Sequence, residues 1–299
     1  MARDRIIGTY GRPGSGPLVI AIAGLHGNEP AGVNALERVF LYLRRYEIDF
    51  SGFFVGLAGN IAALDQGVRY IDEDLNRLWS PELISHAQGL SNSARNTEQR
   101  ELVELIKLME PELDRDYSCK VLFDLHTTSA EGGMFSIVSR KPRHRAFASA
   151  LHAPVLYDLS NSLSTTIGRF IDDQKMIGFA YESGMHTDPE SVDNHEAAIW
   201  LLLSKAGCIN NGNIDVDTDP FHLRLISLSK ALPHYVQVIH RHGISPDDEF
   251  HMYPGFSNFH QVYKGEPLGR DRNGEVLCPV TGLMLMPLYQ NKGSDGFSS

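Results

Sequence analysis

The amino-acid sequence predicts an α/β fold, in which helices flank a mixed, largely parallel sheet and a smaller β-rich domain follows. Three observations support this prediction. Residues 17–25 and 121–125 are apolar runs, which are typical of strands buried on both faces of a sheet. Stretches with helical periodicity separate such runs, as they do in α/β proteins. After Gly207 the chain changes to short apolar runs punctuated by Gly and Pro, the pattern of a β-rich unit.

The first two thirds of the chain supply the elements of the main sheet. Residues 19–25 predict a buried strand, and residues 30–44 predict a helix whose apolar face recurs every three or four residues. Pro30 agrees with that helix, because proline is tolerated best at the first helical position. The remaining predictions are strands at 53–59, 121–125, 134–139, 155–159 and 176–181, a helix at 94–110 that Pro111 ends, and a helix from Pro189 to about Gly207.

The last third of the chain is predicted to form a second domain. Residues 209–220 are polar and rich in turn formers, which indicates a linker. A helix is predicted at 221–232, and short β-like runs follow at 235–240, 249–253, 260–263, 275–280 and 283–289. We therefore expect a catalytic domain over residues 1–213 and a β-rich C-terminal domain over residues 214–299.

The composition of the chain argues against some classes of binding partner. The net charge of -10 over 299 residues argues against nucleic acid, which binds clustered Lys and Arg. The basic cluster at 139–145 fits a solvated surface better than an anion site. Cys119, Cys208 and Cys278 are far apart and form no CxxC pair, so neither a disulfide framework nor a thiolate metal site is expected.

The chain also lacks the signals of membrane insertion. Its first residues contain no apolar signal region, and no stretch approaches 18 apolar residues. We therefore expect a reduced, soluble, cytoplasmic protein with no membrane partner. The sequence is compatible with a homo-oligomer and does not determine the oligomeric state.

Two histidines and one glutamate follow predicted strands. His26 and Glu29 come after the apolar run 17–25, and His126 follows the run 121–125. The carboxyl ends of strands are where α/β proteins build their sites. Imidazole and carboxylate suit Zn²⁺, and three protein ligands leave a fourth position for water. The alternative is structural: a strand-end histidine, a glutamate that caps the next helix and a satisfied core histidine.

The acidic segment DEDLNRLW (72–79) holds a candidate substrate anchor. A guanidinium binds a carboxylate with two parallel hydrogen bonds, so Arg77 fits the anchor of an acidic substrate. Arg69, eight residues earlier, is a candidate to face a developing oxyanion. The alternatives are a helix cap for this segment and, for Arg69, a surface ion pair with Asp72 or Glu73.

Together these motifs resemble the succinylglutamate desuccinylase/aspartoacylase family, which belongs to the zinc carboxypeptidase clan. The resemblance rests on the order and approximate spacing of HGNEPAG (26–32), Arg69 with DLNR (74–77), DLHTTS (124–129) and the YESG that contains Glu182. It covers residues from about 18 to 185, and the ending MPLYQNKGSDGF (286–297) is similar to the family's C-terminal domain. The resemblance implies a zinc-carboxypeptidase-like fold and one zinc ion per chain.

The resemblance implies a role at each matching position. Arg69 is expected to polarise the scissile carbonyl, and Asp74 to orient His26 as metal-bound histidines usually require. Mere solvation of the loop is the alternative for Asp74. The expected zinc ligands are His26, Glu29 and His126.

The resemblance also supplies a base and a substrate anchor. Asn76 and Arg77 are expected to hold the substrate's free carboxylate, and Glu182 to act as the general base. Glu182 has some support of its own, since it follows the apolar run 176–181 and precedes the flexible Gly184. An apolar wall would raise the pKa of its carboxyl, as suits a general base. A helix-capping or ion-paired glutamate is the alternative.

Some positions remain open at this level. Arg169 is a candidate for a second substrate carboxylate, and Tyr289 either reaches the site from the second domain or packs in a core. Surface or core positions are favoured over a second metal site for four late histidines, which are His240, His242, His251 and His260.

These observations predict a zinc-dependent amidohydrolase. Its expected substrate is a small, anionic N-acyl amino acid, which it cleaves to a carboxylic acid and a free amine. A metallocarboxypeptidase acting on short peptides is the first alternative, and a C-terminal domain that covers the mouth of the site would argue against it. A non-catalytic zinc-binding ligand sensor is the second alternative. It would not explain the presence of Arg69, Arg77 and Glu182.

Overall fold

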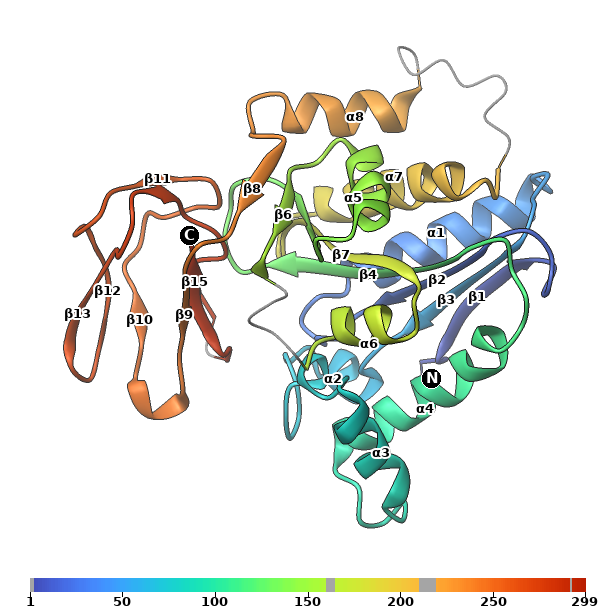
Figure 1. Ribbon diagram of the computed structural model, residues 1–299, viewed down its shortest axis with the longest axis horizontal. Coiled ribbons are helices and arrows are strands. Elements are labelled where there is room, and N and C mark those ends of the chain that lie inside the picture. Colours follow the sequence, from blue (N-terminus) through green and yellow to red (C-terminus); the bar gives the residue numbers. More distant parts are fainter. Residues whose placement is uncertain (1–2, 160–164, 210–218, 291) are drawn as a thin grey trace.

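A mixed eight-stranded sheet forms the centre of the computed structural model, which describes residues 3–159, 165–209, 219–290 and 292–299 (Figure 1). Its strands are β1 (Ile6–Gly11), β2 (Leu18–Ala23), β3 (Phe53–Ala58), β4 (Lys120–Thr128), β5 (Phe135–Val138), β6 (Val155–Tyr157), β7 (Ile177–Met185) and β8 (Tyr235–Gln237). They lie in the order β1-β3-β2-β4-β7-β5-β6-β8. Strand β1 is antiparallel to β3 and β5 is antiparallel to β7, whereas the other neighbours are parallel. The predicted fold class is confirmed.

Helices cover both faces of this sheet (Figure 1). One face is covered by α1 (Ala31–Arg45), α5 (Pro142–Ala148), α7 (Glu190–Ala206) and α8 (Pro220–Ser229). The other face is covered by α3 (Pro81–Gly89), α4 (Thr97–Leu113) and α6 (Ile167–Asp173), and the short α2 (Ile61–Gln66) follows β3.

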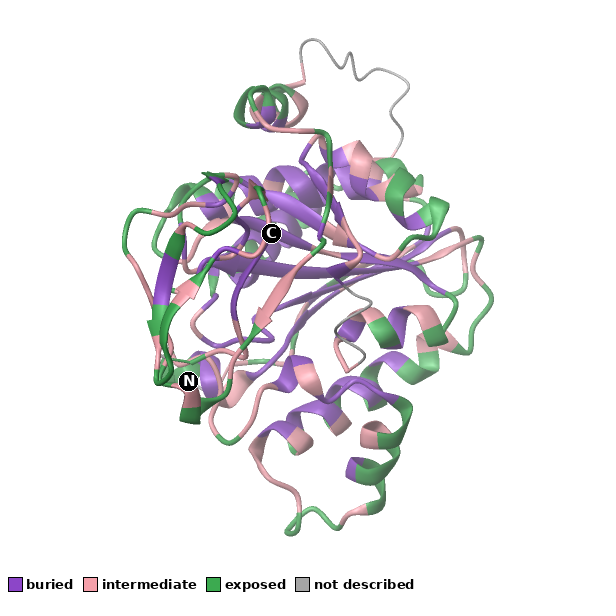
Figure 2. Ribbon diagram, turned by 60° about the vertical axis from the view of Figure 1, so that its left-hand side comes forward, coloured by how far each residue is buried: buried purple, intermediate pink, exposed green. Residues whose placement is uncertain are grey.

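Strand β2 shows why the sheet needs cover on both sides. Its side chains alternate between two separate apolar clusters: Val19, Ala21 and Ala23 join the cluster under α1 and α7, and the intervening residues join the cluster under α4. All six of its residues are buried, and Figure 2 shows the central strands in the colour of buried residues. A continuous apolar run is therefore required here.

The predicted end of the helix at 94–110 is wrong. Helix α4 does not end at Pro111 but continues to Leu113. Proline removes only the hydrogen bond that its own N–H would donate, and beyond it the bond from the Asp114 N–H to the Glu110 carbonyl still forms. A capping box at Asn96 and the buried apolar face of the helix stabilise the turns before it.

The C-terminal part contains small sheets. Helix α8 packs on α7, and β8 adds to the edge of the large sheet. The strands that follow are β9 (Arg241–Gly243), β10 (His251–Met252), β11 (Gln261–Val262), β12 (Pro267–Asp271), β13 (Gly274–Leu277), β14 (Gly282–Leu283) and β15 (Asp295–Ser298). Most of the predicted linker at 209–220, with the domain boundary at 213/214, lies outside the described residues, so the boundary stays a prediction.

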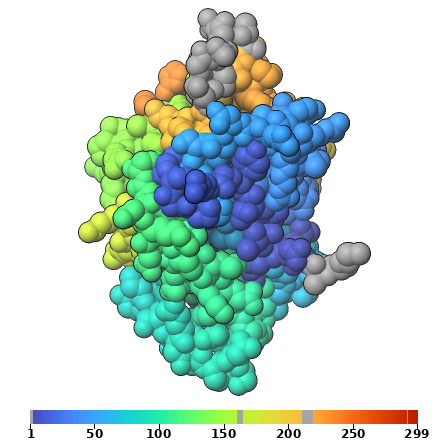
Figure 3. Space-filling model, turned by 90° about the vertical axis from the view of Figure 1, so that its right-hand side faces the viewer, coloured from blue at the N-terminus to red at the C-terminus, as the bar shows by residue number. Residues whose placement is uncertain are grey.

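The two ends of the long axis are built from different parts of the chain. Figure 1 places β10, β12 and β13 at one end. Figure 3 looks at the opposite end, where residues of the N-terminal half, drawn blue to green, form most of the surface. Within the described ranges, none of the helices combines the length and apolar character that a membrane crossing requires.

Candidate active site

A tight loop carries the first two candidate ligands. His26 and Glu29 lie between the end of β2 and the start of α1. Gly27, between them, lies against the backbone of α2, where a Cβ atom would be 2.0 Å from the Ala63 carbonyl carbon. Only glycine permits this approach, so the loop can lie directly against the backbone of α2.

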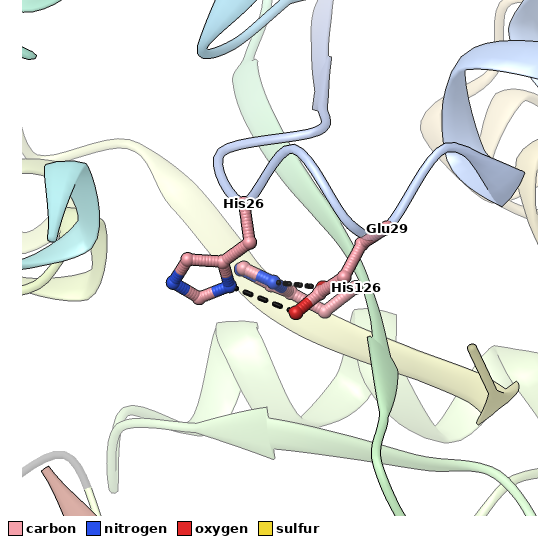
Figure 4. Close-up of side chains that lie close together, drawn as sticks. All are labelled: His26, Glu29 and His126. Atoms are coloured by element: carbon pink, nitrogen blue, oxygen red, sulfur yellow. Dashed lines mark hydrogen bonds and ion pairs between the residues drawn. The ribbon is translucent and has the colours of Figure 1, made fainter. Parts of the chain in front are cut away.

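His26, Glu29 and His126 converge as predicted. Their ligand atoms all lie within 4.8 Å of one another, and all three residues are buried. The Glu29 carboxylate lies between the imidazoles: one oxygen is 2.9 Å from His26 Nδ1, and the other is 2.9 Å from His126 Nδ1 (Figure 4). Among the described residues this is the one group of three or more such side chains close enough to hold a metal ion.

A second carboxylate contacts the Nε2 atom of each imidazole, on the side of the ring away from Glu29. His26 Nε2 lies 3.0 Å from Asp74 Oδ1, which is the contact that the resemblance implies. His126 Nε2 lies 2.7 Å from Asp124 Oδ2, and the side chain of Asp124 is fully buried. Sequence reasoning missed Asp124, although it precedes His126 by two residues on one strand and therefore shares its face.

Charge and burial oppose each other in this group. Burial alone would raise the pKa of Glu29, but the two imidazoles outweigh it and hold this pKa well below its ordinary value. Burial alone would lower the pKa of His126, but Asp124 and Glu29 together raise this pKa well above its ordinary value. The site is therefore a cluster of strongly interacting charges, as expected where function requires them.

Glu182 lies beside His126 on the neighbouring strand. The two residues are partners in the β4–β7 register, and β7 has one extra residue before the next pair, Thr128 and Met185. Gly184, with φ of 135°, lies in this bulge. Burial raises the pKa of the Glu182 carboxyl to about 8. Its Oε2 atom is buried and has no hydrogen-bond partner among the described residues.

Arg69 faces the candidate ligands. Its guanidinium lies 3.3 Å from Asp74 and 3.6 Å from Glu29. The surface ion pair considered from the sequence does not form, because Asp72 and Glu73 accept hydrogen bonds from the start of α4 instead.

Arg77 and Asn76 lie on the same side of the site, and both are already engaged. Arg77 Nη2 donates to Ser294 and lies 3.1 Å from Asp295, two residues of the C-terminal part. The Asn76 amide oxygen accepts the N–H of Ile167, and its nitrogen lies 3.4 Å from His126 Nε2. Contacts with Ser294 and Asp295 join segments more than 200 positions apart, so no local pattern could have predicted them.

A cavity of about 180 Å³ joins these groups. Besides the candidate ligands, it is lined by Arg69, Asn76, Arg77 and Glu182. One wall comes from the C-terminal part and comprises Met286, Leu288, Gln290, Gly293, Ser294, Asp295 and Ser298.

His186 is another lining residue that sequence reasoning missed. Its Nδ1 lies 2.7 Å from the Thr127 hydroxyl, and burial lowers the pKa of this histidine. It follows Glu182 by four residues, and only this proximity in the sequence could have drawn attention to it.

Other candidates lie away from the cavity. Arg169 is half-exposed and pairs with Asp173 on its own helix. The Tyr289 hydroxyl donates to the Tyr253 carbonyl and accepts the N–H of Phe256, so this side chain is engaged within the C-terminal part. Its backbone N–H donates to Ser129, which lines the cavity, but Tyr289 itself does not line it, so a role for Tyr289 in the site stays a prediction.

The late histidines do not form a metal group among the described residues. His240 and His242 share one face, with ring centroids 6.5 Å apart, and both pack against Phe297. The basic cluster at 139–145 is likewise engaged, since Arg140 pairs with Asp158 and Lys141 with Asp172.

The sequence of this chain is similar to those of known proteins. Residues 15–200 match the model of the succinylglutamate desuccinylase/aspartoacylase catalytic domain. A probable aspartoacylase of Prochlorococcus marinus is 29% identical over 292 residues, which cover 94% of this chain and 89% of that protein. A succinylglutamate desuccinylase of Shewanella baltica is 25% identical over 282 residues, covering 86% and 74%.

Solved structures share the fold. A succinylglutamate desuccinylase/aspartoacylase from Rhodobacter sphaeroides superimposes with a TM-score of 0.67 at 17% identity, over 96% of this chain and 84% of that one. A mutant form of murine aminoacylase 3 does so with a TM-score of 0.59 at 17% identity, over 97% and 94%.

Proposed function

Because this chain belongs to the succinylglutamate desuccinylase/aspartoacylase family, whose names indicate deacylation of amides, we propose that it is a zinc-dependent deacylase of small N-acyl amino acids. Hydrolysis of the amide would release a carboxylic acid and a free amine. The observation that carries the proposal is the convergence of His26, Glu29 and His126 beside the buried carboxyl of Glu182.

The side chains fit a zinc ion. Two imidazole nitrogens and a carboxylate oxygen are a ligand set of catalytic zinc sites, and the carboxylates behind both imidazoles are the partners that metal-bound histidines usually have. We propose that His26, Glu29 and His126 hold one ion. When bound, zinc lowers the pKa of a water molecule and polarises a carbonyl group.

Glu182 is placed to move the proton. Its unpartnered Oε2 atom would accept a proton from the attacking water as the water oxygen bonds to the amide carbon. The same carboxyl would return this proton to the nitrogen as the carbon–nitrogen bond breaks, so the amine leaves neutral.

Arg69 and Arg77 would act on the substrate. The Arg69 guanidinium faces the ligand group and is placed to donate to the carbonyl oxygen as that oxygen becomes negative. Arg77, with Asn76, would hold the free carboxylate. Since Asp295 already accepts from Arg77, substrate binding would exchange or share this ion pair.

Several observations favour this function over its alternatives. The wall formed by the C-terminal part confines the cavity, which suits a small molecule better than a peptide chain. A non-catalytic zinc protein would gain nothing from a buried carboxyl with an unpartnered oxygen. The family match and the location of Glu182 thus both support a deacylase.

The test combines metal content with turnover. Purified protein should carry about one zinc per chain and release amine from a panel of N-acyl amino acids and short peptides in a chelator-sensitive way. Replacement of Glu182 by Gln should keep the fold and the zinc but reduce kcat by roughly 10²–10⁴-fold, because a carboxamide cannot accept the water's proton.

The control is Glu37→Gln, an exposed position on α1, which should behave as the wild type. His126→Ala should lose stoichiometric zinc. Full zinc occupancy in that variant, or wild-type turnover in zinc-loaded Glu182→Gln, would contradict the assigned roles.

A further inference from the structure

One side of the cavity is an apolar wall. The apolar wall comprises Ile137 of β5, Ala180 of β7, Ile167 and Ile171 of α6, and Met286 and Leu288 of the C-terminal part. Helix α6 packs on β7, so the wall belongs to the cavity face of the sheet and to the helix that covers it. None of the roles proposed above uses this surface.

Strand register brings the apolar wall next to the proposed base. Ala180 precedes Glu182 by two residues on β7 and therefore shares its face. Its partners on the neighbouring strands are Asp124 of β4 and Ile137 of β5. Its small side chain is only partly buried, although its strand lies inside the sheet, so part of its surface faces the cavity.

Few Lys or Arg side chains line the cavity. All 27 Lys and Arg residues of the chain lie within the described ranges, and the two that line the cavity are Arg69 and Arg77. Each already has a carboxylate partner, Asp74 and Asp295 respectively. The cavity is also lined by four carboxyl groups, which are those of Glu29, Asp124, Glu182 and Asp295.

A second substrate carboxylate would therefore have no free guanidinium to bind. An unpaired carboxylate moved from water to this site would lose its hydration without gaining a free guanidinium in exchange. An aliphatic or aromatic group would instead gain from burial against the apolar wall. The lack of a free guanidinium and the apolar wall both favour a substrate with one carboxylate and an apolar group.

We infer that the preferred substrate has one carboxylate and an aliphatic or aromatic substituent, which lies against the apolar wall. The inference rests on the proposed deacylase function and narrows its substrate class. It separates this chain from the substrates that its relatives' names indicate, since succinylglutamate and N-acylated aspartate each have more than one carboxylate. The substituent belongs either to the amino-acid side chain or to the acyl chain.

The first test is a panel of four compounds. N-acetylleucine and N-hexanoylglycine have one carboxylate and place the apolar group on the side chain and on the acyl chain respectively. N-acetylaspartate and N-succinylglutamate supply the additional carboxylates. We expect at least one of the first two to exceed both of the others in kcat/KM by about tenfold or more, as a single methylene in an apolar pocket contributes 10–200-fold. A polyanionic compound as the best substrate would overturn the inference.

Direct binding separates this inference from the proposed function. The same four compounds are titrated by calorimetry into the Glu182→Gln variant, where no turnover is needed. Tighter binding of a compound with one carboxylate supports the inference even if the wild type hydrolyses none of them, a result that would remove only the deacylase. Tighter binding of a polyanion overturns the inference even if the wild type is an active deacylase.

Two variants examine the apolar wall itself. Ala180→Leu fills space beside Glu182 and should reduce kcat/KM for the preferred apolar substrate by tenfold or more relative to N-acetylglycine. Ile137→Ala removes surface from the wall and should shift the preference toward a larger substituent. Ile239→Ala, at a position 61% exposed and outside the cavity lining, is the matched control and should change neither ratio. Unchanged ratios in both wall variants would show that the substituent lies elsewhere.

Discussion

Asp124 shows how a residue behind a candidate ligand can determine the chemistry of the site. Its carboxylate is fully buried and 2.7 Å from His126 Nε2, so it fixes the ring with Nδ1 toward Glu29. We predict that Asp124→Asn keeps the fold and weakens zinc binding by roughly 10–100-fold, the usual cost of losing such a partner. Competition with a chromophoric chelator measures the affinity.

The matched control for this variant is Asp116→Asn at an exposed position. Equal zinc affinity in both variants would mean that Asp124 does not orient the ligand.

At the residue scale, prediction from the sequence was strong where chemistry is local. The spacing of His26 and Glu29, and their placement after an apolar run, predicted a ligand pair that the structure brings together with His126. The role of Asp295 could not be predicted, because its contact with Arg77 depends on how the C-terminal part packs on the sheet.

At the scale of elements, the loop from β2 to α1 depends on helix α2. Gly27→Ala would place a methyl group 2.0 Å from the backbone of Ala63, so the loop or the helix must move. We predict destabilisation by about 1–3 kcal/mol, the usual cost of overpacking, together with reduced zinc occupancy. Chemical denaturation and metal analysis measure the two effects.

Gly89→Ala, near the end of α3 with no atom within 4 Å of the added methyl group, is the control. It should be neutral or slightly stabilising, as expected for alanine in a helix. If Gly27→Ala matches this control, the close approach has no energetic consequence.

Elements with strong patterns were predicted, and weakly patterned ones were not. Strand β1 escaped prediction because it is an edge strand that contains two glycines and whose only buried residue is Gly8, so it has no apolar run. The end of α4 was misplaced because a proline in the last turn removes only one hydrogen bond. In both cases tertiary packing outweighed the local signal.

At the scale of the whole molecule, the ion pair of Arg77 with Asp295 couples the C-terminal part to the site. Lysine cannot reproduce the two parallel hydrogen bonds of a guanidinium. We predict that Arg77→Lys leaves zinc content unchanged and raises KM for N-acyl amino acids by roughly 10- to 100-fold, the scale of a hydrogen bond to a charged group. Steady-state kinetics measures the change.

Conversion of the substrate's free carboxylate to an amide should weaken the wild type to a similar extent and add little further loss in Arg77→Lys. If the two losses simply add, Arg77 does not hold that carboxylate.

The candidate ligands and the C-terminal wall of the cavity lie far apart in the sequence. They are therefore synthesised at different times. The three proposed zinc ligands are synthesised by residue 126, whereas Asp295 and Ser298 complete the wall much later. Because N-terminal regions generally fold first, the ligand group would assemble while the cavity is still open on one side. We therefore expect the nascent chain to be able to bind the proposed metal ion before it is able to select a substrate.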